Sequence, residues 1–138
     1  FPNALEVSQH LRTMGLVVIV SDGDVVFQPR KIERSGLWQA VDGKVLIYIH
    51  KEHELDDMER RYPASHYVMV DDKLRIHAAM KKIWGERLTT VFPRQGHFAL
   101  DPQTLAAYPA ADIAIERIGD LLKYDLAMLS FIRRDRRA

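Results

Sequence analysis

Residues 66–72, with the sequence HYVMVDD, place two neighbouring aspartates directly after a short apolar run. A continuous apolar run of this length predicts a strand over 66–70 that is buried within a sheet. Asp71 and Asp72 would then lie at the C-terminal end of that strand, which is the edge where open α/β sheets bind their ligands. Because carboxylate oxygens are the protein ligands that Mg²⁺ prefers, the pair is a candidate metal site.

Two earlier apolar runs also end in polar side chains. The run LVVIV at 16–20 stops at Ser21, and the strand predicted over 45–49 is followed by Lys51 after one intervening histidine. A hydroxyl and an ammonium group suit the oxygens of a phosphate group. The sequence therefore predicts a hydroxyl, an ammonium and two carboxylates at the ends of three strands.

Composition limits the classes of protein to consider. The 138 residues suffice for one domain with a core, over 1–138, and the net charge of +1 points to neither nucleic acid nor a membrane surface. The sequence has no cysteine, which excludes disulfides, thiolate metal sites and a cysteine nucleophile, and it has neither a membrane-length apolar run nor a recognisable signal peptide. We therefore expect a cytoplasmic protein, and the start at Phe1 instead of Met predicts a piece of a longer chain.

Helical apolar stripes alternate with the predicted strands. This alternation predicts an α/β fold with a mainly parallel sheet and helices on both faces. The predicted helices cover about 4–14, 29–35, 55–62, 73–83, a turn at 104–107 and a long terminal helix from Ile118 to Ile132, and further strands are predicted over 87–92 and 112–115.

The order of the three strand ends resembles the last three signature motifs of the haloacid dehalogenase-like (HAD) hydrolases. Ser21 resembles the second motif, Lys51 the third, and Asp71-Asp72 the fourth in its double-aspartate form. The resemblance spans about residues 1–123. It implies a Rossmann-like three-layer sandwich, of which this chain is the C-terminal part of the core.

The resemblance also implies roles for these residues in a Mg²⁺-dependent phosphohydrolase. Ser21 and Lys51 would be the catalytic candidates, with Lys51 offsetting charge on the phosphoryl group of a small phosphorylated substrate. Asp71 and Asp72 would hold Mg²⁺. The phosphate-binding candidates are Ser21, Asp22, Gly23 and Lys51.

The first motif of the family, Asp-x-Asp, supplies the nucleophile and has no clear counterpart here. We therefore expect the nucleophile upstream of Phe1, on a missing central strand between 16–20 and 66–70, supplied by the same protein or by a second chain. The chain alone would then be inactive. The alternative is that Asp22-Gly23-Asp24 is the first motif, which would leave no strand-borne second motif.

Other interpretations stay open at this point. A catalytically inactive Rossmann-like binding or assembly module would have the same strands, and the two aspartates would then only cap a helix. A receiver-like phospho-acceptor domain uses the same residue types, but its acids come at the first strand. The lesser candidates are Lys31 and Lys44 for phosphate, 94–97 as a rim loop, and the basic tail at 133–137.

Overall fold

The structure is a computed structural model that describes residues 3–22, 36–41, 44–48, 51–95, 101–125 and 127–129. The strands are β1 (Ile19–Asp22), β2 (Val45–Tyr48), β3 (Tyr67–Val70), β4 (Leu88–Pro93) and β5 (Ile113–Ile115). The α-helices are α1 (Ala4–Arg12), α3 (Leu37–Ala40), α4 (Leu55–Arg61), α5 (Leu74–Trp84) and α6 (Pro102–Ala107). Short 3₁₀ helices are η1 (Lys51–His53), η2 (Gly85–Arg87) and η4 (Ile118–Lys123).

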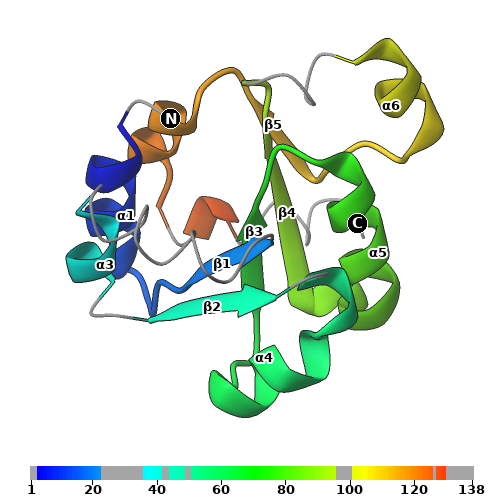
Figure 1. The fold of residues 1–138 in the computed structure, drawn as a ribbon. Coiled ribbons are helices and arrows are strands. Elements are labelled where there is room, and N and C mark those ends of the chain that lie inside the picture. The colour runs from blue at the N-terminus through cyan, green and yellow to red at the C-terminus, as the bar shows by residue number, and fades with distance from the viewer. Residues whose placement is uncertain are drawn as a thin grey trace.

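The strand pairs in the described part of the chain are parallel, as the alternation of helices and strands predicted. β1 pairs with β2, and a second sheet has the order β3-β4-β5 (Figure 1). Parallel neighbours require crossover connections, and the intervening helices provide them. The α/β fold class is confirmed.

Helices cover both faces of the β3-β4-β5 sheet. On one face, Val7 of α1 packs with Val91, Ile113 and Leu121 in a buried cluster. On the other face, α4 and α5 pack against β3 and β4 in a second cluster. This second cluster also receives Val20 of β1 and Leu46 of β2. The result is a three-layer arrangement in which α4 and α5 contact both sheets.

β4 is the central strand of its sheet, and all six of its residues are buried. Leu88 and Phe92 face α5, whereas Val91 faces α1, as the two-residue period of a strand requires. Trp84, the last residue of α5, and Tyr67, the first of β3, stack with ring centroids 4.1 Å apart. The sequence LTTVFP therefore forms the strand on which both layers of helices pack.

The strand predicted over 16–20 is displaced toward the C-terminus. Leu16 is 62% exposed, and the ladder with β2 runs from Ile19 opposite Val45 to Asp22 opposite Tyr48. The strand is shifted because its partner begins only at Val45, so residues before Ile19 have no strand to pair with. The backbone of Ser21 and Asp22 is consequently part of β1.

The long terminal helix predicted from Ile118 is wrong over its described part. η4 ends at Lys123, and Asp125 then caps a new helical turn by accepting a hydrogen bond from the backbone N–H of Met128 at 2.8 Å. Asp120 accepts hydrogen bonds from two backbone N–H groups that precede η4, at 3.1 and 3.2 Å. The Asp120 bonds cap the start of η4, whereas the Asp125 bond starts a new turn and competes with a continuous helix. The helix predicted over 29–35 lies outside the described residues.

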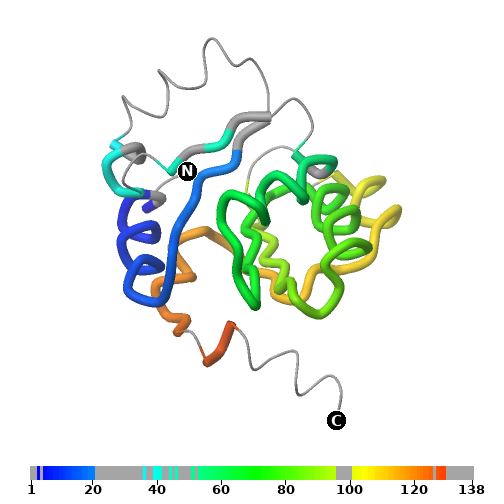
Figure 2. The backbone as a smooth tube through the Cα atoms, turned by 90° about the horizontal axis from the view of Figure 1, so that it is seen from below, coloured from blue at the N-terminus to red at the C-terminus, as the bar shows by residue number. Residues whose placement is uncertain are grey.

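β1 and β3 do not pair with each other in the described part of the chain. The partner of β1 is β2 and the partner of β3 is β4. Figure 2 shows β1, in blue, on the side of its pair that faces β3, in green. Direct pairing of these two strands would have contradicted a missing central strand, and it does not occur.

Candidate functional site

Lys51 and Asp71 form a buried ion pair at the C-terminal edge of the strands. Lys51 is the first residue of η1, directly after the β2 segment, and Asp71 follows β3. The Lys51 Nζ lies 2.5 Å from Oδ2 of Asp71, and the two side chains are only 10% and 7% exposed. Burial of an ammonium group requires such a partner, because an unpaired charge is costly in a protein interior.

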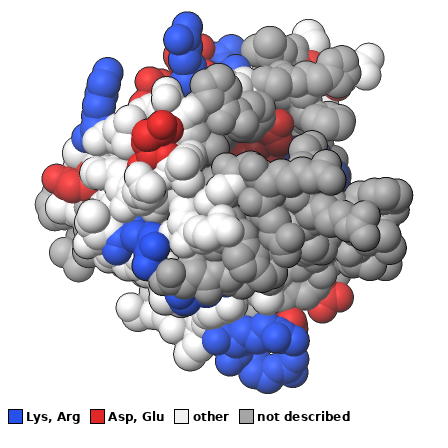
Figure 3. All heavy atoms as spheres, turned by 60° about the vertical axis from the view of Figure 1, so that its left-hand side comes forward, with Lys and Arg blue, Asp and Glu red and all other residues white. Residues whose placement is uncertain are grey.

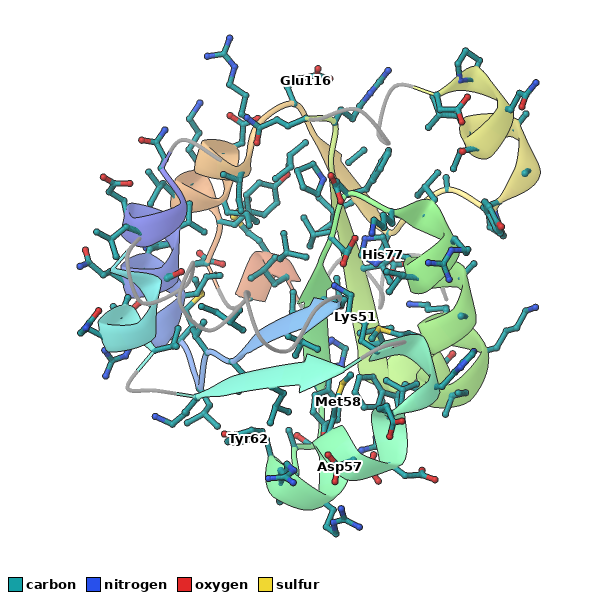
Figure 4. The ribbon with its side chains drawn as sticks, viewed as in Figure 1. Lys51, Asp57, Met58, Tyr62, His77 and Glu116 are labelled. Atoms are coloured by element: carbon teal, nitrogen blue, oxygen red, sulfur yellow. The ribbon has the colours of Figure 1, made fainter. Side chains whose placement is uncertain are left out.

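Lys51 also connects this edge to β1. Its Nζ lies 3.4 Å from the carbonyl oxygen of Val20, the residue before Ser21. The ammonium group therefore lies between the ends of β1 and β3, at the place where the two sheets have no ladder between them (Figure 4). The backbone thus brings the positions of three predicted motifs to one edge.

The structure describes little of three phosphate-binding candidates. The backbone of Ser21 and Asp22 belongs to β1, but their side chains lie outside what the structure describes, as does all of Gly23. The Val20 carbonyl contact therefore places Lys51 beside the Ser21 peptide and gives no position for the hydroxyl. Asp24, the second acid of the alternative Asp-x-Asp motif, is also outside the described residues.

The N–H, the side chain and the carbonyl oxygen of Asp71 all make hydrogen bonds. Its N–H donates to the carbonyl of Val91 at 3.2 Å, which continues the β3–β4 ladder by one residue. Its Oδ1 accepts from the N–H of Lys73 at 2.8 Å, and this bond turns the chain into α5. Its carbonyl oxygen accepts from Nε2 of His77 at 2.8 Å. Such a set of bonds gives the Asp71 side chain a fixed direction.

Asp72 is half-buried beside Asp71. Burial raises the pKa of the Asp72 carboxyl, and the negative charge of Asp71 adds to the rise. Two adjacent carboxylates that are partly removed from water are stabilised by a cation between or beside them. Because both carboxylate oxygens of Asp71 have partners, Asp72 is the better placed of the two to contact a metal ion directly.

The acids at this edge fit Mg²⁺ in number and type. Magnesium is commonly held by one or two carboxylates and keeps several waters or phosphate oxygens as its other ligands. Within the described ranges, no cluster of three or more histidines, aspartates or glutamates is arranged to hold a metal. The pair therefore suits a magnesium site that is completed by water, by substrate or by residues from elsewhere.

His77 belongs to the site but was not among the predicted residues. It lies on the inner face of α5 and is 3% exposed, one helical turn after Leu74 and one before Met80. Ile76 and Met80 are fully buried in this helix, whereas Ile83 is 61% exposed. His77 lies three residues from both Leu74 and Met80, which are apolar. This helical spacing could have identified His77 as a residue of the buried face.

The lesser candidates have structural partners or lie elsewhere. Lys44 precedes β2, at the opposite edge, and its carbonyl accepts from the N–H of Ile19 at 3.0 Å. In the predicted rim loop, the Gln95 Oε1 accepts from the N–H of Ile118 at 2.7 Å, which ties the loop to η4. Lys31, His97 and the basic tail lie outside the described residues.

Charged side chains of both signs are mixed over the described part of the face in Figure 3. This mixture agrees with the net charge of +1 and differs from the basic face that binds nucleic acids. No helix in the described ranges has the length and apolar character needed to cross a membrane.

The structure is similar to a crystal structure, at 2.20 Å resolution, of a protein from Burkholderia xenovorans LB400 that is described as a haloacid dehalogenase-like hydrolase. The sequence identity is 66% and the TM-score 0.88, over 91% of this chain and 58% of that chain. The chain thus spans little more than half the length of this relative. No protein-family model matches the sequence, and no curated protein does. The family resemblance predicted from the motifs is confirmed by the structural relative.

Proposed function

We propose that this chain, a member of the haloacid dehalogenase-like (HAD) hydrolases, forms the phosphate- and Mg²⁺-binding part of a phosphohydrolase. The observation that supports the proposal is the position of Lys51, whose ammonium group connects Val20 of β1 to the aspartate after β3. The substrate class is a small phosphate monoester. The substrate would bind at this edge of the strands.

The reaction proceeds through an aspartyl phosphate. A carboxylate oxygen attacks the phosphorus, the bond to the ester oxygen breaks, and the alcohol leaves after taking up a proton. Water then attacks the same phosphorus, the bond to the aspartate oxygen breaks, and inorganic phosphate leaves. Both steps place negative charge on the equatorial phosphoryl oxygens, and stabilising that charge is the main task of this chain.

Lys51 and Ser21 carry this task. The Lys51 ammonium is already fixed by Asp71, so it needs little reorganisation when charge develops beside it. The Ser21 hydroxyl would donate a hydrogen bond to a phosphoryl oxygen from the end of β1. Asp22 and Gly23, which follow it, would supply further contacts to the phosphate.

Asp72 would hold Mg²⁺, with Asp71 supporting it from the adjacent position. When bound, the ion would neutralise part of the phosphoryl charge and orient the group for attack. The raised pKa of Asp72 agrees with this role, because a carboxylate that is costly to ionise alone gains most from a cation.

The nucleophile would come from a further strand between β1 and β3. Neither strand is paired on that side in the described residues, and Lys51 contacts the ends of both. A strand in this position would end beside the Lys51 ammonium. Its source would be another segment of the same protein or a second chain, since the relative from Burkholderia is considerably longer than the region matched here.

Restoring that segment provides the test. We expect the longer protein to hydrolyse a phosphate monoester such as p-nitrophenyl phosphate only with Mg²⁺, and Lys51→Ala and Asp72→Asn to lower kcat by about 10²–10³. Lys44→Ala is the matched control, because this lysine lies at the opposite edge, and it should retain activity. Activity that survives EDTA would contradict the mechanism.

Activity assays of the chain by itself distinguish the remaining alternatives. We expect no turnover from it. Turnover that is lost in Asp22→Asn would identify Asp22-Gly23-Asp24 as the first motif instead. Inactivity of the longer protein on all phosphate monoesters would favour a binding or assembly module.

A further inference from the structure

One of the two nitrogens of the His77 imidazole makes a close hydrogen bond to the chain. Nε2 lies 2.8 Å from the carbonyl oxygen of Asp71. A carbonyl oxygen can only accept, so Nε2 carries the proton and the ring donates. Nδ1 is then a lone-pair acceptor, and it is buried without a hydrogen-bond partner among the described residues.

A buried nitrogen without a hydrogen-bond partner is unfavourable, and an apolar residue at position 77 would avoid this cost. Its neighbours on the inner face of α5 are Leu74, Ile76 and Met80, all buried and apolar. A leucine at position 77 would suit that face and would carry no buried ring nitrogen, but it would give up the bond to the Asp71 carbonyl. The bond made by Nε2 is therefore the property that distinguishes histidine from an apolar residue here.

That bond acts on the peptide group between the two aspartates. The carbonyl of Asp71 belongs to the same planar unit as the N–H of Asp72, so fixing the oxygen fixes the orientation of the whole plane. The orientation of this plane fixes the N–Cα bond of Asp72, from which its side chain extends. The Asp71 side chain is fixed separately by Lys51 and by the N–H of Lys73.

We propose that His77 is a positioning residue that orients the Asp71–Asp72 peptide and thereby aims the Asp72 carboxylate at the metal ion. Figure 4 shows His77 beside Lys51, on the side of α5 that faces the strands. The inference rests on the proposed function, because it assumes that Asp72 binds Mg²⁺. Residues that orient metal ligands typically change metal affinity 10- to 100-fold when they are replaced.

Two variants separate the hydrogen bond from the packing. His77→Gln keeps an N–H donor at nearly the distance of Nε2, whereas His77→Leu keeps the bulk and removes the donor. The longer protein, with the upstream segment restored, is labelled with ¹⁵N, and Mg²⁺ is titrated while the amide signals of Asp72 and Lys73 are followed. We expect affinity about 10- to 100-fold weaker in His77→Leu and close to wild type in His77→Gln.

His66→Leu is the control for the loss of a ring hydrogen bond elsewhere. The His66 Nε2 lies 2.8 Å from Oγ1 of Thr89, the same length as the His77 bond, at the other end of β3. This variant should lose stability and keep its Mg²⁺ affinity. The ¹⁵N shifts of the His77 ring should show the proton on Nε2.

The outcomes distinguish failure of the inference from failure of the proposed function. Equal affinity of the wild type and His77→Leu would overturn the positioning role alone. A wild-type longer protein whose Asp72 and Lys73 signals do not respond to Mg²⁺ would overturn the metal site, and the positioning role with it. A proton found on Nδ1 would contradict the geometry itself, whatever the metal does.

Discussion

Replacing Lys51 by methionine should destabilise the fold strongly. The substitution keeps an unbranched side chain and removes the ammonium group from a pair whose members are 10% and 7% exposed. The Asp71 carboxylate then stays buried without its counter-charge, and removing one partner of a buried pair costs about 3–5 kcal/mol. Because a domain of this size has roughly 5–15 kcal/mol of total stability, much of it would be lost.

A double-mutant cycle isolates the pair. Asp71→Asn keeps an oxygen that can accept from the N–H of Lys73 and should cost a similar amount, because Lys51 then lacks its carboxylate. The double variant Lys51→Met, Asp71→Asn has no buried charge left at this pair. We expect it to be less destabilised than the sum of the two single variants by about 2–3 kcal/mol.

Urea denaturation followed by far-ultraviolet circular dichroism measures all four free energies of unfolding. Lys82→Met, at an exposed lysine on α5, is the control and should change the free energy by less than about 0.5 kcal/mol. Single-variant effects that add to within about 0.3–0.5 kcal/mol would refute the buried pair as described. The bridge from β1 to β3 would then lose its physical basis.

Three further predictions concern stability. Burial lowers the pKa of His77, so below about pH 6.5 the unfolded chain takes up a proton that the folded chain does not. The free energy of unfolding should therefore fall as the pH decreases. Urea titrations at several pH values should show a flatter dependence for His77→Leu. Asp112→Ala should cost about 3 kcal/mol by the same assay, because its 7% exposed carboxylate accepts from Lys81 Nζ at 2.6 Å and from a β4 N–H at 2.9 Å; no change would contradict that network. Gly85→Ala should lower the free energy of unfolding by about 1–3 kcal/mol, because Gly85 ends α5 with φ at +57°. Gly15→Ala is the control: a Cβ there meets nothing within 4 Å, so thermal denaturation should show almost no change.

The sequence was sufficient to predict the parallel α/β architecture. The strands lie in or beside short runs rich in apolar residues, and these runs alternate with helical stripes, so the class follows from local patterns alone. The edge that carries Lys51 and Asp71 was predictable for the same reason, since parallel strands end on one side. Their ion pair was not predicted, because the distance between two strand ends depends on how the helices pack.

Other features depend on contacts that no local pattern encodes. The start of β1 at Ile19 is set by where β2 begins, and not by the apolar run that starts at Leu16. The terminal helix ends at Lys123 and a new turn follows Asp125, whose side chain bonds a backbone N–H, whereas the apolar spacing continues through both. The role of His77 required knowledge of which carbonyl its ring reaches.

The separation of the two sheets has a consequence for local unfolding. The β1–β2 pair is joined to the β3-β4-β5 sheet by the packing of Val20 and Leu46, by the Lys51 bridge and by covering helices, with no strand-to-strand ladder between the sheets in the described residues. The pair can therefore open as a separate cooperative unit without breaking any hydrogen bond of β4. Amide protons of β1 should exchange with deuterium well before those of β4, so the phosphate-binding end of the site would be the first part of the fold to become accessible.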